Sequence, residues 1–126
     1  MSNDRKIQAT NIQLVAIVAT VISAIISIIT TYNQKLDLEG KDTPLTPKEL
    51  YKLTLFNRLL IIGIALVFLY VNYTLYKISK KDGEDLTTYT LQIIASIITL
   101  IPGLIALYVV ISSNTENIVD IENPII

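Results

Sequence analysis

Few side chains in this sequence are of the types that perform chemistry. There is no His and no Cys, which excludes imidazole bases, thiolate nucleophiles and the common zinc sites. Asp82, Glu84 and Asp85 form the one carboxylate cluster of the sequence, and an enzyme acting on lipids would use such a cluster to hold Mg²⁺. A simpler interpretation is that these residues end one helix and begin the next. We therefore expect no enzyme, no cofactor and no metal site.

Three amide side chains, Gln13, Asn72 and Gln92, lie within otherwise apolar stretches. At 1.5 Å per residue, each lies roughly 6–10 Å from the same end of the expected helices, so all three belong to one leaflet. An amide in lipid seeks a partner, and an interhelical hydrogen bond contributes about 0.6–2 kcal/mol. We predict that Gln92 and Asn72 hydrogen-bond or share a water, with Gln13 nearby. The alternative is that each amide reaches headgroup water separately.

Three uncharged stretches must position these amides. Residues 7–34, 59–76 and 86–115 contain no Asp, Glu, Lys or Arg, and a helix needs about 20 mainly apolar residues to cross a bilayer. The chain is 52% apolar, and backbone groups in lipid must be satisfied within helices. We predict an all-α fold, an integral membrane three-helix bundle that forms a single domain over 1–126. The predicted spans are about 8–33, 57–78 and 88–112.

Three other interpretations of these stretches are weaker. A soluble three-helix bundle needs a polar face on every helix, whereas the centre of the first stretch offers only uncharged Ser and Thr. A β-barrel needs alternating segments, and more of them. Arg5 and Lys6 resemble the start of a signal peptide, but the apolar run is longer than usual and no clear cleavage site follows.

The second helix has the clearest limits. Thr46, Pro47 and Glu49 fit a capping box with Pro at the first helical position, and the Lys-rich stretch before Gly83 suits a helix C-terminus. A helix over 47–81 is about 52 Å long at 1.5 Å per residue. Its N-terminal part must therefore protrude from the roughly 30 Å hydrocarbon core or bend along the interface. Apolar residues line one side of this extension, and we expect Asn57 with Lys48, Glu49 and Lys52 on the rest of its surface.

The other helices have weaker limits. Pro102, within the third apolar stretch, predicts a kink because it removes a backbone hydrogen bond. The remaining expected elements are a first helix over 7–33, a charged loop over 34–46, a third helix from 85–88 to about 113, and a flexible acidic tail over 114–126.

Small and polar side chains recur at helical spacing inside the first and third stretches. Membrane helices associate through such faces, because lipid gives no hydrophobic drive between helices. The expected packing seams are Ala16, Ala19, Thr20, Ser23, Ala24 and Ser27 in the first helix, and Gln92, Ser96, Thr99, Gly103 and Ala106 in the third. These seams fit packing within one monomer, and they also fit contact with a second copy or another protein.

The membrane interfaces are marked by a cation and by tyrosines. The expected interface anchors are Arg58, Tyr70, Tyr73 and Tyr76. An ion pair of Arg58 with Glu116 or Asp37 is the alternative role for that cation. Lys and Arg are almost evenly divided between the two sides, with the N-terminus favoured inside.

These patterns favour a function without catalysis. We expect a small multi-pass protein of a bacterial cell membrane, or of a viral membrane, that acts by helix association as an accessory, regulatory or structural component. Its partners are membrane lipids and either a second copy or another membrane protein, and the near-neutral charge argues against nucleic acid. The alternative is a holin-like oligomeric pore, although three-span holins typically end in a basic tail. Small three-helix lipid kinases of bacteria have a similar length, but they carry a carboxylate- and Asn-rich motif that this sequence lacks.

Overall fold

The computed structural model describes residues 2–113 of the 126-residue chain. This part of the chain folds into three α-helices: α1 (Ser2–Leu38), α2 (Pro47–Lys81) and α3 (Thr87–Ser112). No strand occurs in 2–113, and each helix is long and apolar enough to cross a membrane. The predicted all-α, three-helix fold is confirmed. The predicted acidic tail, 114–126, lies outside the described residues.

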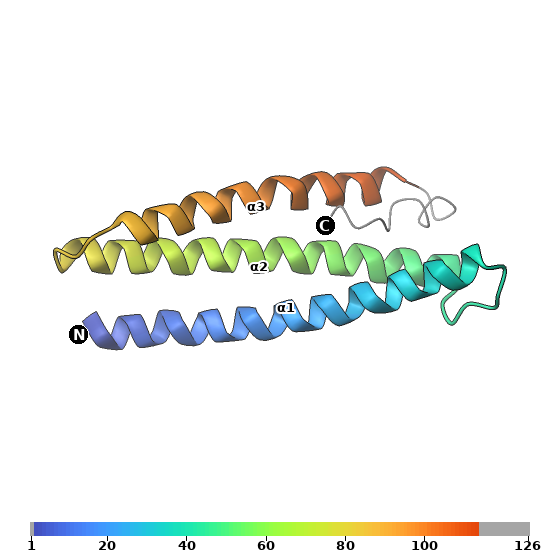
Figure 1. The fold of residues 1–126 in the computed structure, drawn as a ribbon, viewed down its shortest axis with the longest axis horizontal. Coiled ribbons are helices and arrows are strands. Elements are labelled where there is room, and N and C mark those ends of the chain that lie inside the picture. Colours follow the sequence, from blue (N-terminus) through green and yellow to red (C-terminus); the bar gives the residue numbers. More distant parts are fainter. Residues whose placement is uncertain (1, 114–126) are drawn as a thin grey trace.

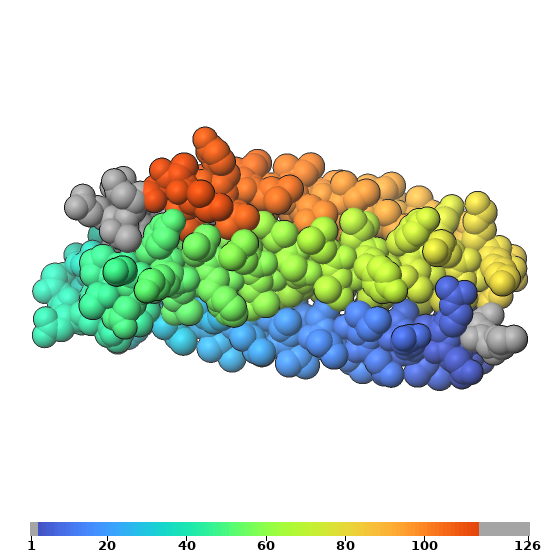
Figure 2. All heavy atoms as spheres, turned by 180° about the vertical axis from the view of Figure 1, so that it is seen from behind, coloured from blue at the N-terminus to red at the C-terminus, as the bar shows by residue number. Residues whose placement is uncertain are grey.

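The helices lie side by side with α2 in the middle (Figure 1). α2 packs against both α1 and α3, which make little contact with each other. Seen from behind, α2 again separates the blue α1 from the orange α3 (Figure 2). The fold is therefore an open bundle, and α2 is the element that holds the other two together.

The limits of α2 follow from local signals. Thr46 Oγ1 accepts a hydrogen bond of 3.2 Å from the Glu49 backbone N–H, and the Glu49 carboxylate accepts one of 3.0 Å from the Thr46 N–H. This is the predicted capping box. At the other end, Gly83 adopts φ +74°, a left-handed conformation that suits Gly after a helix. The predicted limits of this helix, 47 and 81, are confirmed.

Helix α1 is longer than the predicted 7–33. It begins at Ser2 and continues through the polar residues after Asn33 to Leu38. The loop that joins it to α2 therefore spans 39–46 and is shorter than the expected 34–46. The helix ends where Gly40 takes φ +71° and the Lys41 N–H bonds to the Leu36 carbonyl. α1 and α2 therefore run alongside each other beyond the apolar region. The extension of α2 lies against α1, and this support from α1 is why it continues as a helix instead of bending into the interface.

The buried positions of α1 recur every seven residues. Ala9, Ala16, Ser23 and Thr30 are all buried, and Ile26 and Asn33 follow the last two at a spacing of three. This 3-4 spacing is the pattern of helices that cross at about 20°. Small side chains at these positions let α1 lie close to α2.

Helix α3 continues without interruption through Pro102, which lies inside it. Next to it, Gly103 lies against α2, and an added Cβ there would lie 3.6 Å from an Ile62 side-chain carbon. Around α3 and α1, large apolar side chains such as Ile28 and Ile105 point outward and are 67% and 59% exposed. Apolar side chains outside and polar ones inside are the arrangement expected when lipid surrounds the helices. The chain is a multi-pass membrane protein by this criterion.

Candidate functional site

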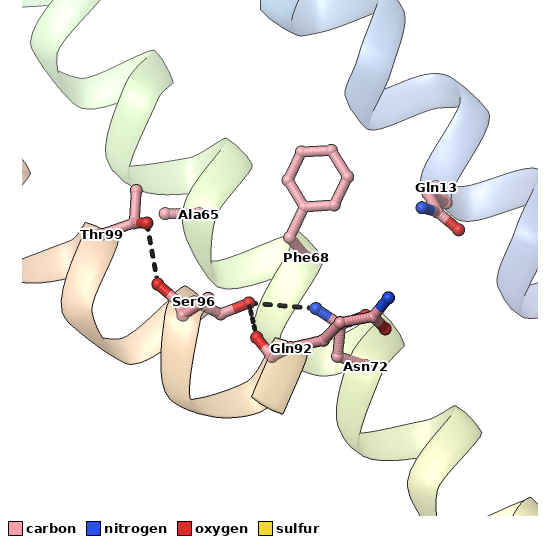
Figure 3. A pocket seen from close by; sticks show the side chains of 8 residues that line it. Gln13, Ala65, Phe68, Asn72, Gln92, Ser96 and Thr99 are labelled. Atoms are coloured by element: carbon pink, nitrogen blue, oxygen red, sulfur yellow. Dashed lines mark hydrogen bonds between the residues drawn. The ribbon is translucent and has the colours of Figure 1, made fainter. Parts of the chain in front are cut away.

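A cavity of about 320 Å³ lies where all three helices contribute side chains. In Figure 3, Gln13 lies on α1, Phe68 and Asn72 on α2, and Gln92 on α3, and all four line the cavity. The remaining residues that line it are Ala65, Ala95, Ser96 and Thr99. The three amides that the sequence placed at one depth therefore line one cavity.

One hydrogen bond crosses from α2 to α3 in this cavity. Asn72 Nδ2 donates to Ser96 Oγ over 3.0 Å, and the Ser96 hydroxyl donates to the Gln92 backbone carbonyl over 2.9 Å (Figure 3). Ser96 is 9% exposed, so this bond is shielded from the surroundings. The predicted partner of Asn72 was the Gln92 side chain. Ser96 takes that place because it lies on the face of α3 that packs against α2.

The side chains of Gln13 and Gln92 make no hydrogen bond within residues 2–113; the Gln92 contact is through its backbone carbonyl. Gln13 is half-buried and Gln92 is exposed. Each amide carries two donor hydrogens and an acceptor oxygen. Gln13 follows Lys6 by seven residues and Gln92 follows Asp85 by seven, which is roughly 10 Å at 1.5 Å per residue. At that depth these groups face a medium that offers few partners. The cavity therefore presents free hydrogen-bonding groups at membrane depth.

A second group of polar contacts lies between α1 and α2. Ser23 Oγ donates to Asn57 Oδ1 over 2.7 Å, and Asn57 Nδ2 donates to Ser27 Oγ over 2.9 Å. Asn57 is 2% exposed. Sequence reasoning placed Asn57 on the polar surface of an extension, whereas it is buried against α1. The sequence did contain one indication that Asn57 is packed. It lies three residues after Thr54, and residues three apart share a helix face.

Arg58 follows Asn57 and is also buried, with 3% of its surface exposed. An interface anchor would project toward the headgroups, but α1 extends far enough to cover this level of α2. At 1.5 Å per residue, Ser27 at the same level lies about 12 Å from Lys35, the next charge along α1. Arg58 is thus a charged group enclosed by protein at membrane depth. Of the two carboxylates considered for it, Asp37 is exposed, and Glu116 lies beyond residue 113.

The predicted packing seams are only partly buried. In α1, Ala16 and Ser23 are buried and Ala19 and Ser27 are half-buried, but Thr20 and Ala24 are exposed. A spacing of four drifts around a helix by about 40° per step, and this carries Thr20 and Ala24 away from α2. The buried line follows the seven-residue repeat instead.

In α3 the packed line is also displaced from the predicted one. Ser96 is buried and Gly103 and Ala106 are half-buried, whereas Gln92 and Thr99 are exposed. Thr99 donates to the carbonyl of Ala95 in its own helix over 2.8 Å. Gln92, Ala95 and Thr99 therefore form an open face of α3, next to the face that packs on α2.

The three tyrosines lie toward the loop that joins α2 to α3. Tyr70 and Tyr73 are 58% and 51% exposed and Tyr76 is half-buried. The Lys77 ammonium lies 5.1 Å from the centre of the Tyr73 ring, within the range of a cation–π contact. Outward-facing tyrosines beside lysines are typical of a membrane interface.

The three clustered carboxylates have separate structural roles. Asp82 caps α2, and Glu84 forms an ion pair of 2.8 Å with Lys6 of α1. Asp85 accepts hydrogen bonds from the Thr87 backbone N–H over 3.0 Å and from its hydroxyl over 2.9 Å. These two bonds, the backbone one first, hold the pKa of Asp85 below its ordinary value. Among the described residues, no three His, Cys, Asp or Glu side chains are grouped so that they would hold a metal ion.

A larger hollow, of about 540 Å³, lies between α1 and α2 and is lined by apolar side chains such as Val15, Leu59 and Ile64. Its lining offers no polar group that would select one ligand. Comparisons with protein families, with curated proteins and with solved structures find no match for this chain. The three-helix cavity, with its free amide groups, is therefore the feature of this fold that bears most directly on function.

Proposed function

We propose that this chain is a small non-catalytic protein of a bacterial cell membrane that acts by associating with other membrane helices. Its role would be that of an accessory, regulatory or structural component. The observation that supports this most directly is the cavity into which Gln13 and Gln92 present amides without a hydrogen-bond partner in residues 2–113. A polar side chain of this kind is stabilised by a hydrogen bond to another helix.

The open arrangement of the helices supports the same proposal. α1 and α3 both pack on α2 and leave its cavity-lining residues accessible between them. A further helix laid between α1 and α3 would contact all three helices. Exposed Ala95 and Thr99 are small enough to allow that close approach.

A photo-crosslinking experiment tests association at this place. A photoreactive amino acid is introduced at Gln92 and, as a matched control, at Leu104, which is 52% exposed on the far side of α3. After irradiation of intact membranes, we expect a discrete protein adduct from position 92 and none from position 104. Equal labelling at both positions, or none at either, would contradict the proposal.

The hydroxyl and amide lining of the cavity also fits a second function, a holin-like oligomeric pore. A pore needs a polar lining through both leaflets, whereas the polar residues of this cavity extend along α3 from Gln92 to Thr99. We therefore expect liposomes containing the purified protein to retain an entrapped dye. Rapid dye release would favour the pore and contradict the association proposal.

A further inference from the structure

We infer that the open face of α3, formed by Gln92, Ala95 and Thr99, is the contact between two copies of this chain related by a two-fold axis along the membrane normal. This inference rests on the proposed association function and names its partner. In such a dimer, α3 of each copy lies in the cavity of the other, between its α1 and its α3.

The burial of α3 supports a missing neighbour at this helix. Within the chain, 11% of the most apolar part of α3 is buried, against 17% for α1, the other outer helix, and 28% for the central α2. α3 packs on α2 through one line that includes Ser96 and Val110. At 100° per residue, Gln92, Thr99 and Ala95 are rotated by about 40°, 60° and 100° from Ser96. All three are exposed while Ser96 is buried, so a second helix can pack on them beside α2.

The chemistry of the open face is complementary to itself. Around a two-fold axis, each residue near the axis meets the same residue of the second copy. Two Gln92 amides at the same depth can each donate an N–H to the carbonyl oxygen of the other, because an amide is both donor and acceptor. Ala95 and Thr99 add only a methyl group and a hydroxyl. A charged side chain at any of these positions would instead repel its own copy.

The absence of charge also narrows the choice of occupant. The cavity lining contains amides, hydroxyls and apolar groups but no Asp, Glu, Lys or Arg. A partner helix that carried a charge to this depth would find no opposite charge there to offset its desolvation. The same α3 from a second copy brings an uncharged amide at the matching depth. Gln13, on the α1 side of the cavity, remains for a second hydrogen bond to that helix.

Single-cysteine crosslinking tests the dimer directly, because the chain has no Cys and each variant carries one thiol. The test variants are Ala95→Cys and Thr99→Cys. The matched controls are Ile97→Cys and Leu104→Cys, on the opposite side of α3 and 48% and 52% exposed. After mild oxidation in native membranes, we expect a disulfide-linked dimer from positions 95 and 99 and only monomer from 97 and 104.

The contribution of the amide is measured by adding Gln92→Leu to Thr99→Cys. We expect the dimer yield to fall roughly tenfold, the factor that about two interhelical hydrogen bonds support. Circular dichroism of the same variant should be unchanged, because the Gln92 side chain makes no hydrogen bond within residues 2–113.

The remaining outcomes separate this inference from the function on which it rests. If no cysteine position gives a dimer while the photoreactive residue at 92 captures a different protein, the two-fold contact is wrong and association stands. If all four cysteines crosslink equally, the dimers are random collisions and the two-fold contact is wrong. If neither method captures anything at the open face, both proposals fail.

Discussion

Asn57 of α2 lies between Ser23 and Ser27 of α1, accepting a hydrogen bond of 2.7 Å from one hydroxyl and donating one of 2.9 Å to the other. All three are uncharged and lie within the apolar parts of their helices. Because the two serines are four residues apart, one amide bridges one turn of α1. This contact fixes both the rotation of the two helices and their register.

Replacing Asn57 with Leu should destabilise the protein by about 1–3 kcal/mol, since two interhelical hydrogen bonds are lost and the buried Ser23 and half-buried Ser27 hydroxyls lose their partner. The measurement is unfolding in mixed detergent micelles. Asn11→Leu is the matched control, because Asn11 is exposed on α1 and should change stability little. Ser23→Ala should have a smaller effect than Asn57→Leu, because the bond to Ser27 remains. Equal effects of the two Asn variants would contradict this assignment.

Asn72 and Gln92 should respond differently to replacement by Leu. Asn72→Leu removes the 3.0 Å bond to Ser96 and should lower unfolding stability by about 1 kcal/mol. Gln92→Leu removes no side-chain hydrogen bond within the described helices and should leave unfolding of the monomer unchanged within about 0.5 kcal/mol. Both measurements are made in a large molar excess of detergent over protein, which favours the monomer. If Gln92→Leu lowered stability more than Asn72→Leu, the result would favour the direct hydrogen bond between the Gln92 and Asn72 side chains that the sequence suggested.

The N-terminus of α2 should depend on its capping box. Thr46→Ala removes the acceptor for the Glu49 N–H and should cost about 0.5–2 kcal/mol. Hydrogen exchange should show faster exchange in the first turn of α2, with the centre of the helix unchanged. Thr88→Ala, at an exposed position in α3, is the control. Unchanged exchange after Thr46→Ala would mean that packing on α1 alone holds this turn.

The loop between α2 and α3 should make a pH-dependent contribution to the stability of the folded chain. Hydrogen bonds from Thr87 hold the pKa of Asp85 below its ordinary value of 3.8, so the ionised carboxylate stabilises the folded chain above that value. This contribution is lost as the pH falls through the lowered folded pKa.

Asp85→Asn keeps an acceptor oxygen but cannot ionise, so it isolates this term. The wild type should melt at a higher temperature than Asp85→Asn near pH 6, and the difference should shrink below about pH 4. Thr87→Val, which retains the backbone N–H, should show a weaker version of the same change. A difference between the melting temperatures that is constant with pH, or that grows as pH falls, would show that the carboxylate does not contribute in this way.

Features that depend on residues close in the sequence were predicted correctly, whereas features that depend on a neighbouring helix were not. Thr46, Glu49 and Gly83 act within one turn of themselves, and the ends of α2 were predicted correctly from them. The common depth of Gln13, Asn72 and Gln92 followed from counting residues along helices, and all three line one cavity.

The failures concern features that depend on which helix lies alongside. α1 continues past Asn33 because α2 supports it there, and no residue within that segment signals this. Asn57 and Arg58 were placed outside the packed region because their depth depends on the register between α1 and α2. Gln92 and Thr99 were placed in one seam with Ser96, and their spacing alone does not show that only Ser96 is covered within the chain.

The order of the helices in space is their order in the sequence, with α2 between the other two. During biosynthesis, Ser23 and Ser27 are made before Asn57 and enter the bilayer ahead of it. Their hydrogen-bond partner, Asn57, lies in the next helix to be made, so α1 and α2 can insert together as a hairpin. α3 is made last and packs on a hairpin that has already formed. A nascent chain that stops before α3 would therefore already contain the polar contacts between α1 and α2.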